Sequence, residues 1–373
     1  MSILFIALLY KSTEALLMPR TRPVTRLAAA AALAIITVAL VSGGAAAAKT
    51  NNSTASSEPV TLRLGYFPNV THAPALVGVG AGIFQKALGP NVTLQLKTFN
   101  SGTDELTAIQ AGALDAAYIG PNPTISAWTQ LDKGVRVVSG AASGGAYFVV
   151  KPDINTAADL KGKTVASPQL GNTQDVALRT WLKKNGLQTD TSGGGDVKIV
   201  PQDNATSLTA FESGDIQGAW VPEPWATRLV TEGGGKILVD EATLWPKGQF
   251  VTTQVIVTSS FVKDHKDVVQ KLVNGQVAAN DYIAKHTADA EQLVSQGIKQ
   301  ITGKPIDGNL VIASFKNITF TNDPIASSLV QDNKHQKALG FPAASSLSGL
   351  YDLSFLNKAL KAAGEPTIPA TKT

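Results

Sequence analysis

Residues 107–123 read TAIQAGALDAAYIGPNP, and residues 209–225 read TAFESGDIQGAWVPEPW. Both stretches begin with Thr-Ala, reach a glycine (Gly112 or Gly214), continue through an apolar segment with one aromatic residue and end in a proline-rich loop. Glycine after a helix adopts a positive φ without strain from a Cβ atom. The pattern therefore predicts two copies of one unit, in which a short helix is followed by a buried strand and a loop. It is also common in α/β proteins generally, so the repeat alone does not decide the architecture.

The composition limits the function classes that are open. A chain of 373 residues with 44% hydrophobic and 16% charged residues predicts a globular protein of two domains. Cysteine is absent, which excludes disulfides, thiolate metal sites, a cysteine nucleophile and a lipid-modified N-terminal cysteine. The four histidines are far apart in the sequence, so their spacing indicates no zinc site.

The first 48 residues have the pattern of a secretory leader. Arg20, Arg22 and Arg26 precede an apolar run over residues 27–41, and a small-residue segment at 43–48 suits cleavage after Ala48. An uncleaved membrane anchor is the alternative. We expect Met18 to be the true start. The leader carries Lys11 and these arginines against Glu14, so its removal lowers the formal net charge from +4 to about +1, and no basic face for nucleic acid is expected.

The rest of the chain divides into a tether and two lobes. Residues 49–59 are polar and predict a disordered tether. Residues 60–150 and 250–373 are expected to form lobe 1, residues 151–249 to form lobe 2, and two crossing segments to act as a hinge. The fold class is thus α/β, with helices predominating after residue 261.

The candidate site lies in loops that leave predicted strands and open predicted helices, at residues 66–72, 120–124, 167–173 and 221–225. Helix N-termini carry unpaired N–H groups and a partial positive charge, so converging N-termini bind an anion without a metal or a cationic side chain. The loops add mostly neutral donors, which suit an oxyanion that must be released again. These candidates are Asn69, Thr71, His72, Asn122, Thr124, Gln169, Asn172 and Thr173.

Each candidate has a structural alternative. Ser, Thr and Asn residues in such loops are often helix caps, and His72 could be a packed loop residue. Trp220 and Trp225 fit packing, although one could line the cleft. Glu223 would repel an anion, so we favour a role in fixing its loop over binding of a substrate ammonium.

No motif nominates a catalytic residue or a cofactor. The chain lacks a G-x-S-x-G elbow, H-E-x-x-H, a phosphate-binding P-loop and a strand-linked G-x-G-x-x-G. We therefore expect a protein that is not an enzyme and needs no metal or cofactor.

Several longer phrases resemble a known family. They are LRLGYFPNVTHAPAL (62–76), DELTAIQAGALDAAYIGPNPTISAW (104–128), DLKGKTVASPQLGNTQDVALR (159–179), GAWVPEPWATRLV (218–230) and FVTTQVIVTSSFV (250–262). In this order, after a leader, they resemble the extracytoplasmic solute-binding proteins of ABC importers, in the aliphatic sulfonate, nitrate and taurine branch.

The resemblance implies a two-lobed periplasmic-binding-protein fold of type II that closes on a small oxyanion, most simply an aliphatic sulfonate, and delivers it to a membrane permease with its ATPase. Nitrate, taurine and a thiamine-pyrimidine precursor are alternative ligands. The implied protein is a monomer in the periplasm or another extracytoplasmic space, and it is not a lipoprotein. The cleft residues that the resemblance implies, beyond the donors above, are Tyr66, Phe67, Gly120, Gly171, Trp220, Glu223 and Trp225.

Two rival functions use a similar fold. Thiamine-pyrimidine synthases look alike overall but need a cysteine-rich iron motif, which this chain cannot supply. A ligand-sensing subunit that signals to a membrane receptor would use the same cleft, and only its partner would differ.

Overall fold

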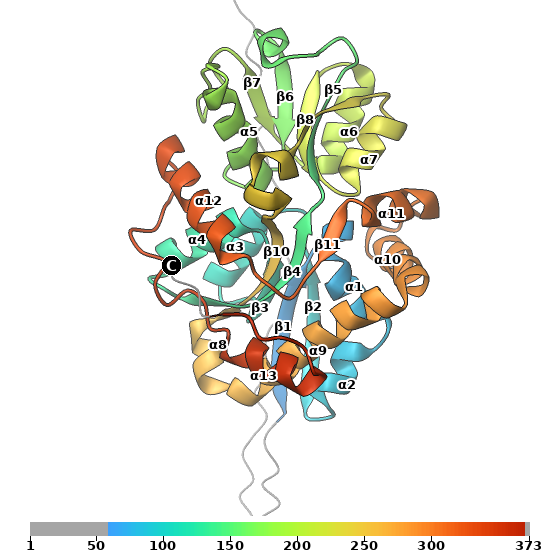
Figure 1. The fold of residues 1–373 in the computed structure, drawn as a ribbon, viewed down its shortest axis with the longest axis vertical. Coiled ribbons are helices and arrows are strands. Elements are labelled where there is room, and N and C mark those ends of the chain that lie inside the picture. The colour runs from blue at the N-terminus through green and yellow to red at the C-terminus, as the bar shows by residue number, and fades with distance from the viewer. Residues whose placement is uncertain (1–58, 370–373) are drawn as a thin grey trace, which may run out of the picture. The chain divides into compact units, whose positions relative to one another are not determined.

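The computed structural model describes residues 59–369. The predicted leader, the expected start at Met18 and all but the last residue of the predicted tether lie outside these residues. The described part contains two β-sheets with helices on both faces of each (Figure 1). The predicted α/β class is confirmed.

The first sheet has six strands in the order β11-β4-β10-β3-β1-β2. Strands β2, β1 and β3 are parallel, whereas β10 runs antiparallel to both β3 and β4. The strands are β1 (Val60–Tyr66), β2 (Val92–Thr98), β3 (Ala116–Ile119), β4 (Val135–Gly144), β10 (Val251–Thr258) and β11 (Ile318–Phe320).

The second sheet has five strands in the order β7-β6-β8-β5-β9. Strands β7, β6 and β8 are parallel, and β5 is antiparallel to β8 and β9. The strands are β5 (Ala146–Val150), β6 (Thr164–Ser167), β7 (Lys198–Pro201), β8 (Gly218–Pro222) and β9 (Lys236–Asp240).

The repeated pattern forms the expected unit in each sheet. In the first copy, α3 (Gly102–Gln110) leads through Gly112, with φ of 65°, to β3 and then to α4 (Pro121–Gln130). In the second, α6 (Asn204–Ser213) ends at Gly214, with φ of 86°, and leads to β8 and α7 (Trp225–Thr231). Both strands are fully buried, as their apolar sequences predict.

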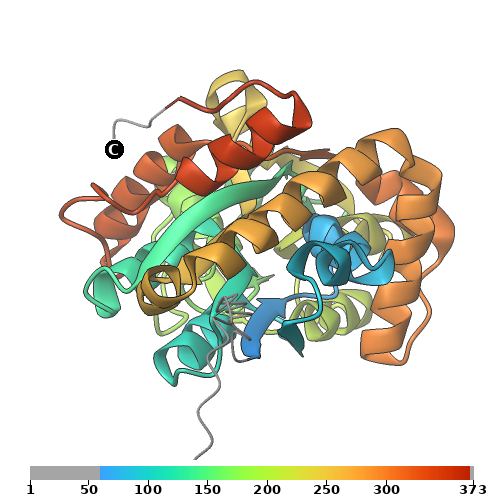
Figure 2. The same cartoon turned by 90° about the horizontal axis from the view of Figure 1, so that it is seen from below.

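The helices cover the sheets as amphipathic layers. On one face of the first sheet, Val269 and Leu272 of α9 pack with Leu64 of β1, and on the other face Trp128 of α4 packs with Leu329 of α12. Figure 2 shows α9 and α13 lying across the first of these faces. The remaining helices are η1 (Val70–His72), α1 (Ala73–Gly80), α2 (Ile83–Leu88), η2 (Ala157–Leu160), α5 (Thr173–Lys184), η3 (Glu241–Leu244), η4 (Pro246–Gly248), α8 (Ser259–Asp264), α9 (Lys266–Lys285), α10 (Thr287–Thr302), α11 (Gly308–Phe315), α12 (Ala326–Leu339) and α13 (Ser354–Ala363).

The place where the chain changes sheet differs from the expected one. We expected the first crossing after Val150, but Ala146–Val150 already pairs with β8 and β9 of the second sheet. The crossing is therefore at Gly144 and Gly145, where positive φ values of 81° and 70° redirect the chain between two strands that both read as apolar. The chain returns to the first sheet between Asp240 and Val251. We propose that the lobes follow the sheets, and we use lobe 1 for the six-stranded sheet with its helices and lobe 2 for the five-stranded one.

Candidate functional site

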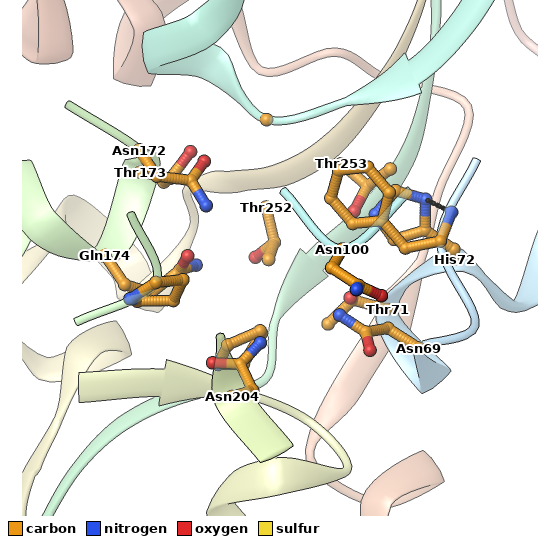
Figure 3. Close-up of a pocket in the computed structure, with 14 residues that line it drawn as sticks. Asn69, Thr71, His72, Asn100, Asn172, Thr173, Gln174, Asn204, Thr252 and Thr253 are labelled. Carbon is orange, nitrogen blue, oxygen red and sulfur yellow. Dashed lines mark hydrogen bonds between the residues drawn. The ribbon is translucent and has the colours of Figure 1, made fainter. Parts of the chain in front are cut away.

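A small cavity lies where loops from both sheets meet (Figure 3). Its volume is about 20 Å³, and a site for one water needs roughly 10–15 Å³ on a comparable measure. The cavity therefore has room for a compact chemical group and not for an extended molecule. It is lined by Phe67, Asn69, Thr71, His72, Asn100, Gly120, Pro168, Asn172, Thr173, Gln174, Asn204, Pro222, Thr252 and Thr253.

Part of the candidate set from the sequence is brought together here. Phe67, Asn69, Thr71, His72 and Gly120 come from lobe 1. Asn172 and Thr173 come from the start of α5 in lobe 2. Figure 3 shows the lobe 2 side chains opposite Asn69, Thr71 and His72, with Thr252 between the two groups.

Other candidates are not among the residues that line the cavity. The Thr124 hydroxyl donates to the Gly120 carbonyl at 2.9 Å and accepts from Gln254. The Asn122 amide donates to Gln336 of α12 at 3.1 Å. Tyr66 is buried at the end of β1.

Gln169 and Gly171, in the loop after β6, do not line the cavity, and Gln169 joins the two lobes instead. Gln169 donates to the Asp104 carboxylate at 2.9 Å and accepts from the Thr103 hydroxyl. The backbone N–H of Gly171 donates to Asp175 at 2.9 Å. This loop thus holds the start of α5 against α3.

Trp220, within β8, and Glu223, just after it, both bond to other parts of the protein. Trp220 is fully buried and donates to Glu241 at 2.7 Å. Glu223 accepts from the Thr227 backbone and hydroxyl, from Asn317 at 2.7 Å and from Ser314 at 3.2 Å. Burial raises the pKa of the Glu223 carboxyl, and these hydrogen bonds oppose that rise. Its place in the structure therefore matches the loop-fixing alternative.

Several lining residues were missed by the sequence analysis. They are Asn100, Pro168, Gln174, Asn204, Pro222, Thr252 and Thr253. Asn100 follows β2 and Asn204 follows β7, so the rule that selected the other strand-to-helix loops would also have found these two. Thr252 and Thr253 lie at the start of β10. Because β10 is antiparallel, its first residues share an edge with the last residues of β3, which no local pattern reveals.

Helix N-termini give the cavity its electrostatic character. Asn172 is the N-cap of α5, Asn204 is the first residue of α6 and Gly120 is the N-cap of α4. None of these helices has a side chain capping its first N–H groups. The free N–H groups of α5 and α6 and the helix dipoles attract negative charge. In α4, Pro121 and Pro123 have no N–H, so Asn122 offers the one free N–H of its first turn.

Buried polar atoms without partners line the same space. The hydroxyls of Thr173 and Thr253 and the side-chain oxygen of Asn204 are buried and have no hydrogen-bond partner. Buried polar groups in folded proteins are nearly always bonded, and an exception calls for an explanation such as a bound water, a bound ion or a functional role. The arrangement can thus accept a polar group that donates to or accepts from these atoms.

His72 is held as a neutral donor. Its Nδ1 accepts from the Phe67 backbone N–H at 3.3 Å, and its ring stacks on Phe67 with 4.1 Å between centroids. Burial lowers the pKa of the His72 imidazole to about 3. The neutral ring therefore carries its proton on Nε2, where it can be donated.

The lining carries no formal charge: among the described residues, no Asp, Glu, Lys or Arg side chain borders the cavity. Within residues 59–369, no three His, Cys, Asp or Glu side chains meet in a group that could hold a metal ion. Binding here would depend on hydrogen bonds and helix dipoles.

Comparison with known proteins places these features in a family. The sequence profile of the NMT1-like family matches residues 55–297, more than half of the chain. The chain belongs to the NMT1-like family. Among the relatives of this chain, the taurine-binding periplasmic protein of Escherichia coli is 28% identical over 213 residues, which cover 57% of the chain. The alignment spans 63% of that relative's own length.

Solved structures share the fold. The alkanesulfonate-binding protein SsuA of Xanthomonas axonopodis pv. citri, bound to MOPS, superposes with a TM-score of 0.66 at 18% identity, over 80% of this NMT1-like chain and 99% of its own. The periplasmic nitrate-binding protein NrtA of Synechocystis PCC 6803 gives a TM-score of 0.67 at 17% identity, over 82% and 89%. The predicted family and the periplasmic-binding-protein fold are confirmed.

The relatives also bear on two broader predictions. They are named for the solutes that they bind and not for a reaction, in agreement with the expectation that the chain is not an enzyme. The taurine-binding and nitrate-binding relatives are periplasmic by name. Between residues 59 and 369, no helix combines the length and the apolar character needed to cross a bilayer.

Proposed function

We propose that this NMT1-like protein is the substrate-binding component of an ABC importer and captures a small oxyanion between its two lobes. One observation carries the proposal: three uncapped helix N-termini and three unpartnered buried polar side chains meet in a cavity without charged side chains. The names of the relatives, which include binding proteins for taurine, alkanesulfonate and nitrate, support the same class of ligand.

The chemistry suits reversible capture. Helix N-termini stabilise an anion through fixed dipoles, and neutral donors such as Thr173 and His72 add hydrogen bonds without the strong desolvation penalty of a buried ion pair. Because the donors come from both lobes, the full hydrogen-bond set exists only when the lobes are together. The ligand then favours the closed state by the contacts that it gains there.

We propose an aliphatic sulfonate as the first ligand to test. Taurine would add an ammonium, but Glu223, the carboxylate that could have received it, accepts four hydrogen bonds from the protein. Nitrate is small enough to fill the cavity, but it would make fewer contacts outside the cavity than an aliphatic sulfonate would. A thiamine-pyrimidine precursor is a further candidate, although it lacks the concentrated negative charge that helix N-termini favour.

The partners follow from the same proposal. The protein is expected to be an extracytoplasmic monomer that is not a lipoprotein and that delivers its ligand to a membrane permease with its ATPase. A ligand-sensing subunit would have the same cavity but a receptor as partner. Affinity capture of the tagged protein from its own membranes, scored for permease or receptor, separates these two roles.

Thermal-shift screening, followed by calorimetry, tests the ligand class. Methanesulfonate, longer alkanesulfonates, taurine, nitrate and a hydroxymethylpyrimidine are compared on the purified protein and on Thr173→Val as a control for site binding. Stabilisation by a sulfonate that weakens in Thr173→Val supports the proposal. Stabilisation by the pyrimidine alone, or by none of the anions, contradicts it.

A further inference from the structure

We propose that the groove next to the cavity, bounded by α6, α7, the end of α10 and the segment from Lys304 to Leu310, binds an uncharged organic tail of the ligand. The proposal rests on the proposed function, because the tail belongs to an oxyanion held in the cavity. It narrows the ligand class to organic oxyanions with an apolar chain or ring. It also assigns specificity-determining residues that lie outside the cavity.

Continuity links the two spaces. Asn69, Asn100 and Asn204 line both the cavity and the groove. The groove measures about 670 Å³, whereas the cavity measures about 20 Å³. An organic group attached to an oxyanion in the cavity must leave it somewhere, and these shared residues lie where it would pass into the groove.

The groove contains buried and half-buried apolar side chains beside polar and charged ones. Leu208 and Ile298 are buried, and Trp225, Ile306 and Leu310 are half-buried. Four charged side chains of the lining are exposed, namely Glu212, Glu232, Lys304 and Asp307, and two are half-buried, namely Asp203 and Arg228. A tail that lies along these apolar side chains would gain from the hydrophobic effect, beside the polar residues that also line the groove.

The half-buried cation of the groove, Arg228, is already occupied. The Arg228 guanidinium lies 4.9 Å from the centroid of the Trp225 ring and pairs with Glu232 at 2.8 Å. It is thus engaged on both sides and offers little to a second anionic group. This arrangement favours a neutral tail over a dianionic ligand.

Trp225 joins the groove to the cavity. Its indole Nε1 donates to Asn69 at 3.0 Å, so one edge of the ring is fixed at the shared wall. An indole held in this way presents a large apolar surface at little cost in side-chain entropy. On the opposite wall, Leu310 of α11 and Ile306 just before that helix complete the apolar surface.

The test compares how affinity depends on tail length in three forms of the protein. Methane-, propane- and hexanesulfonate are titrated calorimetrically into the unaltered protein, Leu310→Ala and Ile312→Ala. Ile312 lies on the same helix but is exposed and borders a different depression, so its variant is a matched control. In the unaltered protein, we expect each added methylene to strengthen binding about twofold to fourfold, up to the limit set by full burial of a CH2 group.

The variants decide whether the groove is responsible. Leu310→Ala should halve this dependence on chain length, whereas Ile312→Ala should leave it unchanged. Ile306→Ala serves as a second groove variant if Leu310→Ala lowers the melting temperature. Equal affinities for all three sulfonates, or the same chain-length dependence in the groove variants and in Ile312→Ala, would overturn this inference alone. Failure of all three sulfonates to bind would overturn the choice of a sulfonate as ligand and this inference with it, and failure of nitrate and taurine as well would overturn the proposed function.

Discussion

Trp225 of lobe 2 donates its indole N–H to the Asn69 side chain of lobe 1, with 3.0 Å between Nε1 and Oδ1. Asn69 is nearly fully buried and lines the cavity. The bond therefore joins the two lobes at the cavity wall itself. On the other side of the site, Gln169 joins α3 through Asp104 and Thr103. Direct bonds thus join the two lobes on both sides of the cavity.

Removing the indole N–H should weaken binding by weakening closure. Trp225→Phe keeps an aromatic ring but loses the bond to Asn69, and one such bond contributes about 0.5–1.5 kcal/mol. Affinity for methanesulfonate should fall about twofold to tenfold, as measured by calorimetry. Trp181→Phe, on the far side of α5 against Phe148, controls for the loss of an indole. An unchanged affinity in Trp225→Phe would show that this bond does not favour closure.

Gly120 should be intolerant of a side chain because the lobes meet there. A Cβ atom at Gly120 would overlap the hydroxyl of Thr173 and lie 3.6 Å from the Thr252 carbonyl oxygen. Gly120→Ala is therefore expected to hold the lobes apart and to weaken ligand binding at least tenfold, while the fold of each lobe persists. Calorimetry and a melting curve separate the two effects.

Gly308→Ala is the matched control for this change. Gly308 is the first residue of α11, and a Cβ atom there has no neighbour within 4 Å. Its affinity should equal that of the unaltered protein. If Gly120→Ala also binds normally, the close approach of the lobes at this point is not needed for binding.

The fold could be predicted in most of its parts because its main determinants are local. The repeated unit places an apolar strand after each glycine, and both strands form as predicted. The crossing between lobes was misplaced because β4 and β5 are both apolar, and only pairing with β8 and β9 assigns Ala146–Val150 to the second sheet. Strand pairing depends on residues far away in the sequence, which local patterns do not contain.

The site could be predicted only where strand ends and helix starts coincide. That rule finds Asn69, His72, Asn172 and Thr173, which line the cavity. It also selects Thr124, whose hydroxyl is used by Gly120 and Gln254. Whether a polar side chain faces the ligand or its own backbone depends on the packing around it.

Thr173→Val should separate the cost of an unpartnered hydroxyl from its use in binding. The buried hydroxyl has no partner, so an isosteric methyl group should leave the ligand-free protein as stable or raise the free energy of unfolding by about 1 kcal/mol. Binding should weaken about tenfold to a hundredfold, since hydrogen bonds to charged groups contribute about 1.5–3 kcal/mol. Urea unfolding and calorimetry measure the two quantities.

Thr180 provides the control for this experiment. Its hydroxyl is also buried without a partner, but the residue does not line the cavity. Thr180→Val should therefore match Thr173→Val in stability and the unaltered protein in affinity. Equal affinities in both variants would argue against a ligand contact at Thr173.

Glu241 should make the protein less stable as the pH rises. Burial, together with the nearby Asp240, raises the pKa of the Glu241 carboxyl from 4.5 to about 7, against the bond from Trp220. The folded state thus holds a proton that the unfolded state loses above pH 4.5. Below pH 4.5 this contribution to the free energy of unfolding is fully present. As the pH rises from 4.5 to 7, the free energy of unfolding falls by up to about 1.4 kcal/mol per pH unit.

Glu241→Gln should remove this dependence. The amide oxygen can still accept from Trp220, so the variant should be more stable than the unaltered protein at pH 8 and close to it at pH 4.5. Unfolding in urea at several pH values measures the difference. Glu212→Gln, at an exposed position, is the control. Parallel curves for Glu241→Gln and the unaltered protein would contradict the raised pKa.

His72 should act in the opposite direction below neutral pH. Burial lowers the pKa of its imidazole from 6.5 to about 3. As the pH falls below 6.5, the unfolded chain binds a proton that the folded chain does not, so the free energy of unfolding falls by up to about 1.4 kcal/mol per pH unit. His72→Gln, whose amide can also accept from Phe67 and donate to a ligand, should lack this loss. The gap in stability between the two proteins should therefore shift by about 2 kcal/mol in favour of the variant between pH 6.5 and pH 5. His286→Gln removes an exposed imidazole and controls for the loss of one histidine.

Ligand affinity should stay constant from pH 5 to pH 8, because His72 remains a neutral donor throughout. An affinity that changes tenfold over this range in the unaltered protein, but not in His72→Gln, would show that His72 titrates in the folded state and would overturn its assignment as a neutral donor.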